Sequence, residues 1–325
     1  MIRLVPALVV AAALLLAGCA GTTPSGPSPT GGDGAFPVTI THGQGAVTVP
    51  ARPQRVVVLG FADAQIATAI GAPVVAAARN PSSPDGNWAG VNPPLPADVT
   101  VLDNITPNLE AITAARPDLI LMTTAQPSFS ASYPQIAAIA PTVSHLGRLL
   151  EDPGDDLVRV IGRATGRTAE ADALIAHSNA AIAATAARHP DLRGRSYAFG
   201  QYHNGQTFVV VAQDGPTAAF FRRLGMQVAP GLAGLPVAQA GAATLPPENL
   251  ARLDTADVAF LGLYAPGDEQ RFRSQPLARN LDVLQGDRLR VLTTDEASLL
   301  LAPNPATTET TLALVEPTLA QITAP

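Results

Sequence analysis

The sequence predicts an α/β protein with two similar lobes, and a repeated pattern leads to that class. Residues 107–122 combine a short helical pattern, a turn, an Asp and a buried apolar strand, and residues 247–262 repeat this order. In the first copy Leu109 and Ile112 share a helix face, and Pro117 ends the helix. A helix, a tight turn and a buried strand form half of a βαβ unit. Any α/β protein repeats such units, so the two copies alone do not decide between one lobe and two.

A long helical stretch between the two copies is the third observation. Residues 155–188 are mainly helical in pattern, with a break at Gly166 and Arg167. Ala171, Leu174, Ile175 and Ile182 mark an apolar face. The part after the break would be about 30 Å long, enough for a strut between two halves. An ordinary packing helix would have the same pattern.

Composition restricts the classes of function. The chain has 325 residues, of which 47% are hydrophobic, enough for one large or two modest domains. Its net charge of −6 argues against a nucleic-acid partner held by a basic surface. All 20 basic residues are Arg. The absence of Lys excludes a lysine-bearing phosphate loop, a Schiff base and a lysine general base.

The N-terminal segment predicts export and a membrane anchor. Residues 1–18 have the basic start, the apolar run and the small residues of a signal peptide. The end of this segment resembles the lipobox of bacterial lipoproteins, in which the cysteine, here Cys19, carries the lipid. A plain signal peptide with a chance cysteine is the alternative. Residues 19–37 then form the expected lipidated Cys and flexible tether, because they are rich in Thr, Pro, Ser and Gly.

The folded part should begin with a β-hairpin at residues 38–41 and 47–49. Strands are expected at residues 56–59, 74–77, 142–143, 196–199, 208–211 and 289–292. Helices are expected at residues 63–70, 133–140 and 215–224 and in a closing segment around residues 312–322, where Pro317 predicts a kink or a late start. Residues 79–96 are rich in Pro and Gly and should form a functional or mobile loop.

The order of these elements resembles the substrate-binding lipoproteins of bacterial ABC importers for ferric siderophores, heme and cobalamin. The resemblance spans about residues 38–325 and rests on residues 47–59, 108–121, 133–143, 161–167 and 248–250. It implies two Rossmann-like α/β lobes joined by a single long helix, with a ligand cleft between them. The implied boundaries are residues 38–150 for the N-terminal lobe, 151–190 for the connecting helix and 191–325 for the C-terminal lobe. Members commonly have a tryptophan near residues 280–288, where this chain has Asp282 and Val283.

The resemblance implies a lipid-anchored protein on the outer face of the cytoplasmic membrane. It would act as a monomer that captures a ferric siderophore and delivers it to the transmembrane subunits of an ABC permease. Heme and cobalamin are the alternative ligands. The protein should need no cofactor.

The expected ligand contacts lie on loops at the carboxyl ends of strands, where α/β folds bind ligands. Arginine suits the oxygens of a siderophore complex, and aromatic rings suit its apolar rim. Arg79 is the first candidate, and Trp88 and Tyr202 come next. The other candidates are Phe61, Asp63, Gln126, Phe129, His203 and Tyr264. Each could also be an ordinary loop residue. If heme is the ligand, Tyr202, His203 or Tyr264 could bind its iron.

Glu110 and Glu248 occupy matching places near the start of the helix in the two repeated patterns. In the family, glutamates at these places pair with arginines of the two permease subunits. Each could instead only stabilise its own helix through the helix dipole.

Other classes of function find less support in the sequence. No Gly-x-Ser-x-Gly motif appears, and His42, His145, His177, His189 and His203 lack the spacing of a local zinc motif. We therefore expect no catalytic residues and no metal site. A membrane-tethered adhesion or scaffold protein would share the anchor but would not have a ligand cleft.

Overall fold

The computed structural model describes residues 35–285 and 288–323. The expected signal peptide, Cys19 and most of the expected tether lie outside these residues. Phe36, at the end of the expected tether, packs against the core of the N-terminal lobe. Within the described residues, no helix is long and apolar enough to cross a membrane.

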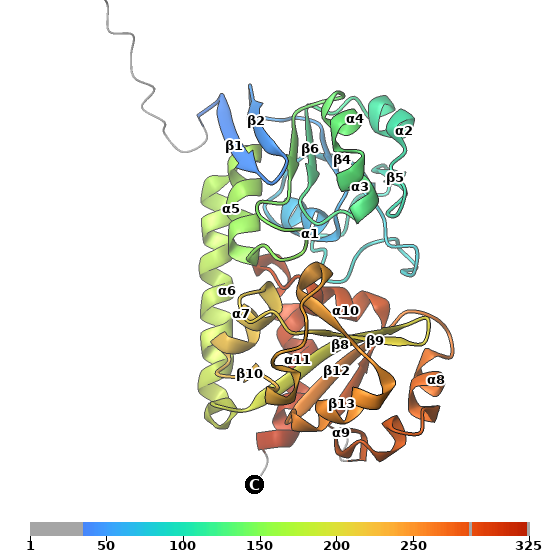
Figure 1. Cartoon of the computed structure of the whole chain (residues 1–325). Helices are drawn as coiled ribbons and strands as arrows, with labels where there is room; N and C mark the ends of the chain where they lie inside the picture. Colours follow the sequence, from blue (N-terminus) through green and yellow to red (C-terminus); the bar gives the residue numbers. More distant parts are fainter. Residues whose placement is uncertain (1–34, 286–287, 324–325) are drawn as a thin grey trace, which may run out of the picture. The chain divides into compact units, whose positions relative to one another are not determined.

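The N-terminal lobe is built on a parallel five-stranded sheet, at the top of Figure 1. Its strand order is β5-β4-β3-β6-β7, with β3 at Val56–Val58, β4 at Val74–Ala78, β5 at Thr100–Leu102, β6 at Leu119–Met122 and β7 at Thr142–Ser144. The expected hairpin is present as β1 (Val38–His42) and β2 (Gly45–Val49). The helices are α1 (Phe61–Ala69), α2 (Leu109–Ala114), α3 (Pro127–Ala131) and α4 (Tyr133–Ala137). Strand β5 and helix α3 were not predicted.

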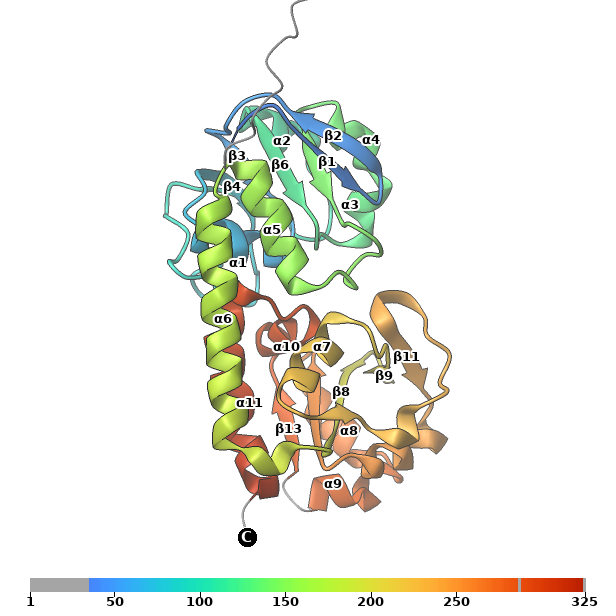
Figure 2. The ribbon, with the colours of Figure 1, turned by 90° about the vertical axis from the view of Figure 1, so that its left-hand side faces the viewer.

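Two consecutive helices lead out of this lobe. Helix α5 (Gly154–Thr165) ends at Gly166, whose φ of 67° is left-handed, and α6 (Thr168–Arg188) follows. The predicted break in the helix is therefore confirmed. Ala171 and Ile175 of α6 belong to the core of the N-terminal lobe, whereas Ile182 belongs to the core of the C-terminal lobe. One continuous helix thus takes part in both cores (Figure 2).

The C-terminal lobe has a mixed sheet in the order β11-β9-β8-β12-β13, with β10 beside β8. The strands are β8 (Ser196–His203), β9 (Gln206–Val210), β10 (Gln227–Val228), β11 (Ala242–Leu245), β12 (Val258–Leu263) and β13 (Leu289–Leu292). The helices are α7 (Pro216–Arg223), the 3-10 helix η4 (Pro247–Thr255), α8 (Asp268–Ser274), α9 (Asp282–Gln285), α10 (Thr294–Leu301) and α11 (Thr308–Thr323). Helix α11 starts well before Pro317 and contains it, so the late start was wrong.

Five strands of the C-terminal sheet correspond in order to the five of the N-terminal sheet, and β10 has no counterpart. Strands β5, β4, β3, β6 and β7 match β11, β9, β8, β12 and β13, except that β9 runs antiparallel to β8 whereas β4 is parallel to β3. The aspartate before β6 and the aspartate before β12 have the same role. Asp118 accepts hydrogen bonds from the backbone N–H groups of Gln54 (2.7 Å) and Arg55 (2.9 Å), and Asp257 accepts one from Ser196 (2.7 Å). The repeat seen in the sequence therefore reflects two equivalent units.

The chain between α10 and α11 provides a further link between the lobes. Ala302 is buried in the core of the N-terminal lobe, and the Asn304 side-chain amide donates to Gln65 Oε1 on α1 (2.8 Å). Helix α11 then packs along α6, where the Ser178 and Thr308 hydroxyls form a buried hydrogen bond of 2.6 Å (Figure 2). The lobes are therefore held together by side-chain contacts as well as by α6.

Candidate functional site

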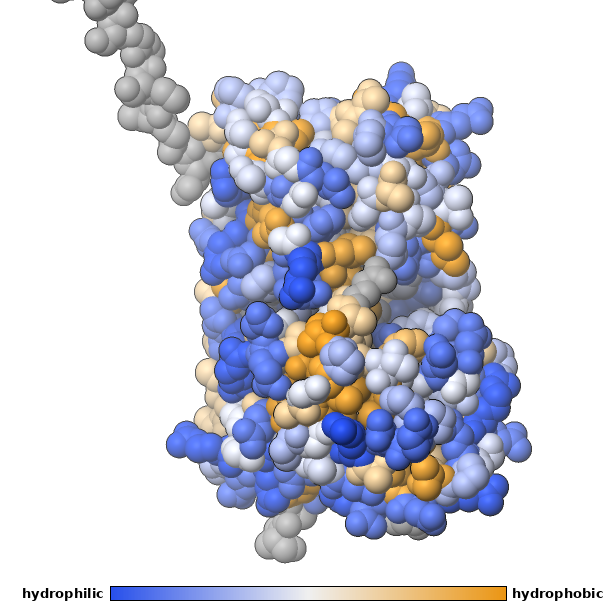
Figure 3. Space-filling view, in the orientation of Figure 1, coloured by the Kyte–Doolittle hydropathy of each residue, from blue (hydrophilic) through white to orange (hydrophobic). Residues whose placement is uncertain are grey.

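A cavity of about 560 Å³ lies between the two lobes. Its wall in the N-terminal lobe is residues 82–84, in the loop that follows β4. Its walls in the C-terminal lobe are residues 263–267 after β12 and residues 293–295 after β13. The space-filling view shows the molecule hollowed between the lobes (Figure 3). Loops at the carboxyl ends of strands thus form this cavity, which is where open α/β sheets bind ligands.

Asp295 connects the two lobes at this cavity. It lies in the first turn of α10, and its Oδ1 accepts hydrogen bonds from Asn80 Nδ2 (2.9 Å) and from the backbone N–H of Ala89 (2.8 Å). Burial raises the pKa of Asp295, and these two hydrogen bonds partly offset that rise. Sequence reasoning missed this residue, because its partners are more than 200 positions away. The only available signal was its position just after a predicted strand.

Arg79 is buried and maintains the shape of the loop after β4. Its Nη1 donates to Asn87 Oδ1 (2.8 Å) and its Nη2 to the carbonyl of Pro96 (3.2 Å), while its buried Nε has no partner in the described structure. The guanidinium therefore joins the two ends of the loop. It does not line the interlobe cavity.

Trp88 and Phe61 lie together beneath the same loop. The Trp88 Nε1 donates to the carbonyl of Ala78 at the end of β4 (2.9 Å), and the ring centroids of Trp88 and Phe61 are 5.9 Å apart. Trp88 is half-buried and Phe61 is buried. The pair fastens the loop to β4 and α1. Two residues further on, a Cβ at Gly90 would lie 2.8 Å from the Thr307 methyl group, so the loop passes close to Thr307.

Asp63 is fully buried and joins the start of α1 to the end of β6. Its oxygens accept hydrogen bonds from the backbone N–H of Gly60 (3.0 Å) and from both the backbone and the hydroxyl of Thr123. Burial raises the pKa of Asp63 to about 6, although these hydrogen bonds favour the ionised form. Phe129 is also buried, in the core beneath α3, and Gln126 is exposed just before that helix.

His203 and Tyr264 meet at the ends of the neighbouring strands β8 and β12. Their rings are edge-to-face with centroids 5.5 Å apart, and Tyr264 lines the interlobe cavity. Tyr202 is buried edge-on against Phe272, and it lines a separate hollow that it shares with Glu248. Of the aromatic candidates, Tyr264 is therefore the one that lines the cavity.

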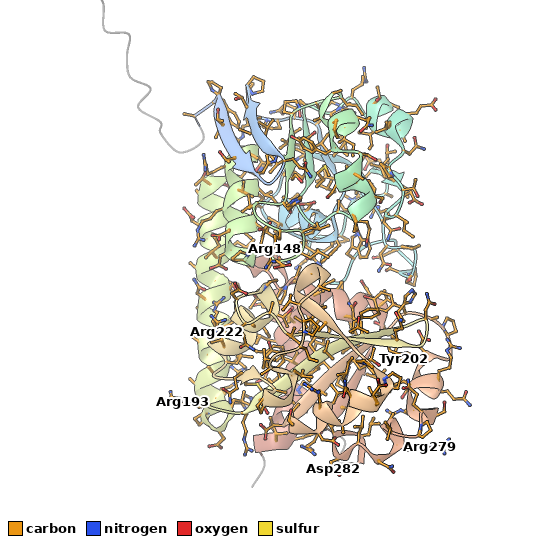
Figure 4. All side chains as sticks on the ribbon, viewed as in Figure 1. Arg148, Arg193, Tyr202, Arg222, Arg279 and Asp282 are labelled. Carbon is orange, nitrogen blue, oxygen red and sulfur yellow. The ribbon has the colours of Figure 1, made fainter. Side chains whose placement is uncertain are left out.

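Arg148 is a candidate that sequence reasoning missed. It lies in the loop after β7, and Figure 4 shows it on the edge of the N-terminal lobe that faces the C-terminal lobe. Its side chain is 69% exposed and forms an ion pair with Glu151. The sequence could have indicated Arg148, because it follows a predicted strand in the same way as the other candidates.

Glu110 and Glu248 occupy equivalent places in the two lobes. Glu110 is the second residue of α2, which leads into β6, and Glu248 is the second residue of η4, which leads into β12. Strands β6 and β12 have the same place in the order of the two sheets. Both are exposed, and neither makes a hydrogen bond or an ion pair within the described residues. Figure 1 shows α2 on the side of its lobe away from α6, and Figure 4 shows Tyr202, which shares a hollow with Glu248, on the corresponding side of the other lobe.

Comparison with known proteins identifies the class. The chain belongs to the periplasmic binding protein family, which matches residues 56–296. A periplasmic solute binding protein from Mycobacterium smegmatis has a similar structure, with a TM-score of 0.72 and 26% identity over 88% of this chain and 99% of that chain. The structure of Streptococcus pneumoniae PiaA in complex with ferrichrome has a TM-score of 0.71 and 19% identity, over 87% of this chain and 99% of that chain. The structure of Staphylococcus aureus SirA complexed with staphyloferrin B has a TM-score of 0.66 and 20% identity, over 88% of this chain and 98% of that chain. No curated protein matches significantly.

These comparisons confirm the predicted family and the two-lobed α/β fold. They do not test the individual ligand contacts, which stay predictions. Among the described residues, no group of three or more His, Cys, Asp or Glu side chains is placed to hold a metal ion.

We expect Asp63 to make stability depend on pH. Its pKa of about 6 in the folded state exceeds the ordinary value of 3.8, so the folded state binds this proton more tightly than the unfolded chain. The free energy of unfolding should therefore fall as pH rises from 4 to 6.5, by up to about 3 kcal/mol from this group. Chemical denaturation at several pH values measures it. In Asp63→Asn the free energy of unfolding should no longer show this fall with pH, whereas Asp98→Asn, at an exposed site, should still show it. An unchanged slope in Asp63→Asn would contradict the assignment.

Proposed function

We propose that this protein captures a ferric siderophore in the interlobe cavity and delivers it to an ABC-type permease, without catalysing a reaction. The observation that carries the proposal is the cavity between two α/β lobes, bounded by loops at the carboxyl ends of strands. Membership of the periplasmic binding protein family supports it. So does the similarity in fold to PiaA with ferrichrome and SirA with staphyloferrin B.

The chemistry of the cavity suits an oxygen-rich ligand. Its lining includes the hydroxyl residues Ser82, Ser83, Thr293 and Thr294 beside the ring of Tyr264. Arg148 is not among the lining residues, but it lies on the edge of the N-terminal lobe that faces the C-terminal lobe. Heme is the second candidate, since Tyr264 lines the cavity with the His203 ring against it, and a Tyr or His side chain can bind heme iron.

Titration with ferric siderophores tests the ligand assignment. Trp88 is the only tryptophan, and it lies in the loop that supplies residues 82–84 to the cavity, so an iron-loaded ligand should quench its fluorescence. We expect a Kd below about 1 μM for at least one hydroxamate, catecholate or carboxylate complex. Tyr264→Ala should weaken binding about tenfold or more by removing a cavity wall. Leu277→Ala, at an exposed site outside the cavity, should not.

The outcome that contradicts the siderophore assignment is specific. Heme binding with a shifted Soret band, and no binding of any ferric chelate, would move the assignment to heme. Binding of neither ligand would leave the cavity without its proposed occupant and refute the proposal.

Glu110 and Glu248 are proposed to dock the protein onto the permease, one per subunit. Both carboxylates are exposed and free of partners in the described structure, and they occupy equivalent places on two linked lobes. Arg-carboxylate pairs can be bidentate, so two such pairs would fix the orientation of the protein as well as attract it.

Replacing both glutamates should separate docking from helix stabilisation. Glu110→Ala with Glu248→Ala should abolish uptake in cells but leave ligand affinity unchanged. The melting temperature should change little, because a dipole contribution at an exposed helix start is only about 0.3–1 kcal/mol. Asp172→Ala with Asp282→Ala, a control pair at other exposed positions, should leave uptake normal. Normal uptake by the glutamate double variant would refute docking, and a large fall in melting temperature would favour the structural role.

Cys19 is proposed to carry a lipid that holds the protein on the outer face of the cytoplasmic membrane. The support is the sequence Leu16-Ala17-Gly18-Cys19 after an apolar run. More than one acyl chain is needed for stable anchoring. Cys19→Ala should therefore move the protein from the membrane fraction to the soluble fraction, as immunoblots of separated fractions would show. A variant that stays as firmly bound as the parent would exclude this anchor.

A further inference from the structure

A hollow of about 370 Å³ lies on the C-terminal lobe, away from the interlobe cavity. Three segments line it. Ala186, Ala187 and His189 come from the end of α6, Pro190 and Arg193 from the turn that follows, and residues 222–225 from the end of α7. Figure 4 shows Arg193 and Arg222 on the side of this lobe next to α6. Tyr202 and the shared hollow of Glu248 are on the other side.

The walls of this hollow are fixed by backbone hydrogen bonds. The N–H of Gly194 donates to the carbonyl of Gly225 (2.9 Å), and the N–H of Gln227 donates to the carbonyl of Arg195 (2.9 Å). Gly225 has a left-handed φ of 91°, and a Cβ there would lie 3.2 Å from the Cα of Arg193. The backbone of Arg193 is therefore held directly beside the end of α7.

The lining is cationic. It contains Arg193, Arg222 and Arg223 but no Asp or Glu. The Arg193 side chain makes no hydrogen bond or ion pair within the described residues, and it is exposed. Arg222 donates to the carbonyl of Gln213, and Arg223 donates to Asn179 Oδ1. Since a guanidinium has five N–H donors, each of these two residues keeps donors for a ligand.

Opposing charges do not cancel this excess. The carboxyl ends of α6 and α7 each contribute roughly half a negative charge and the exposed Asp191, in the turn beside Arg193, contributes one more, against three guanidinium groups, which leaves about one positive charge. Glu316 on α11, the helix that packs along α6, already forms ion pairs with Arg188 (2.8 Å) and with His189 (2.9 Å). Arg222 and Arg223 also stabilise the last turn of α7, but that role does not explain the position of Arg193.

We propose that this hollow binds an oxyanion of the phosphate class, either a free phosphate or the phosphate of a lipid headgroup. Guanidinium groups form bidentate hydrogen bonds with phosphate oxygens, and a phosphate has enough oxygens for several arginines at once. Binding here is independent of the ligand in the interlobe cavity.

Calorimetry with inorganic phosphate, at an ionic strength kept constant with chloride, tests the site. The purified protein should bind one phosphate, and Arg193→Gln should weaken binding by about tenfold or more. Arg273→Gln removes the same charge from an exposed position on the same lobe, outside the hollow, and should change binding less than about twofold. Because Arg193 is exposed and unpaired, its variant should keep the melting temperature and siderophore affinity of the parent.

Vesicles distinguish the two sources of phosphate. Sedimentation with phosphatidylcholine vesicles that contain phosphatidylglycerol, but not with phosphatidylcholine alone, would identify a lipid headgroup if Arg193→Gln abolishes it. Binding of inorganic phosphate without vesicle binding would identify a free anion. Equal binding by the parent and Arg193→Gln in both assays, or no binding in either, would overturn the proposal.

Discussion

Helix α6 supplies side chains to two separate hydrophobic cores, and the arrangement of the lobes depends on this. Ala171 and Ile175 pack in one core and Ile182 in the other, so bending the helix between them would disturb at least one close-packed interior. The buried hydrogen bond between Ser178 and Thr308 lies between these positions and adds α11 to the same support. The interlobe cavity is bounded by loops whose spacing this support sets.

The sequence predicted most of the elements that have a strong local pattern. The buried run of β6, the break at Gly166 and the apolar face of α6 follow from periodicity and from backbone preferences, which act over a few residues. It gave no prediction for β5, β10, β11, α3, α8, α9 and α10, which are short and whose burial depends on neighbours that only the tertiary structure supplies. It also misjudged the start of α11, because packing against α6 outweighs the cost of Pro317 within the helix.

The candidate site was less predictable than the fold. Choosing polar and aromatic residues at the ends of strands selected two of the loops that border the interlobe cavity, those after β4 and β12, and Tyr264 lines the cavity. The same reasoning could not distinguish a side chain that faces a ligand from one that shapes its own loop. Arg79 and Trp88 are used in the second way, through hydrogen bonds to Asn87 and to the carbonyl of Ala78. Asp295 was missed because its partners come from the other lobe.

The link through Ala302 and Asn304 also affects the order in which the chain folds. Both residues lie near the C-terminal end of the sequence, yet Ala302 completes the core of the N-terminal lobe and Asn304 bonds to Gln65, 239 positions earlier. Domains generally fold as units during synthesis, the N-terminal one first. Here the first lobe can form its sheet early, but it lacks part of its interior until residues 302–304 have been made. The two lobes therefore reach their final packing together rather than one after the other.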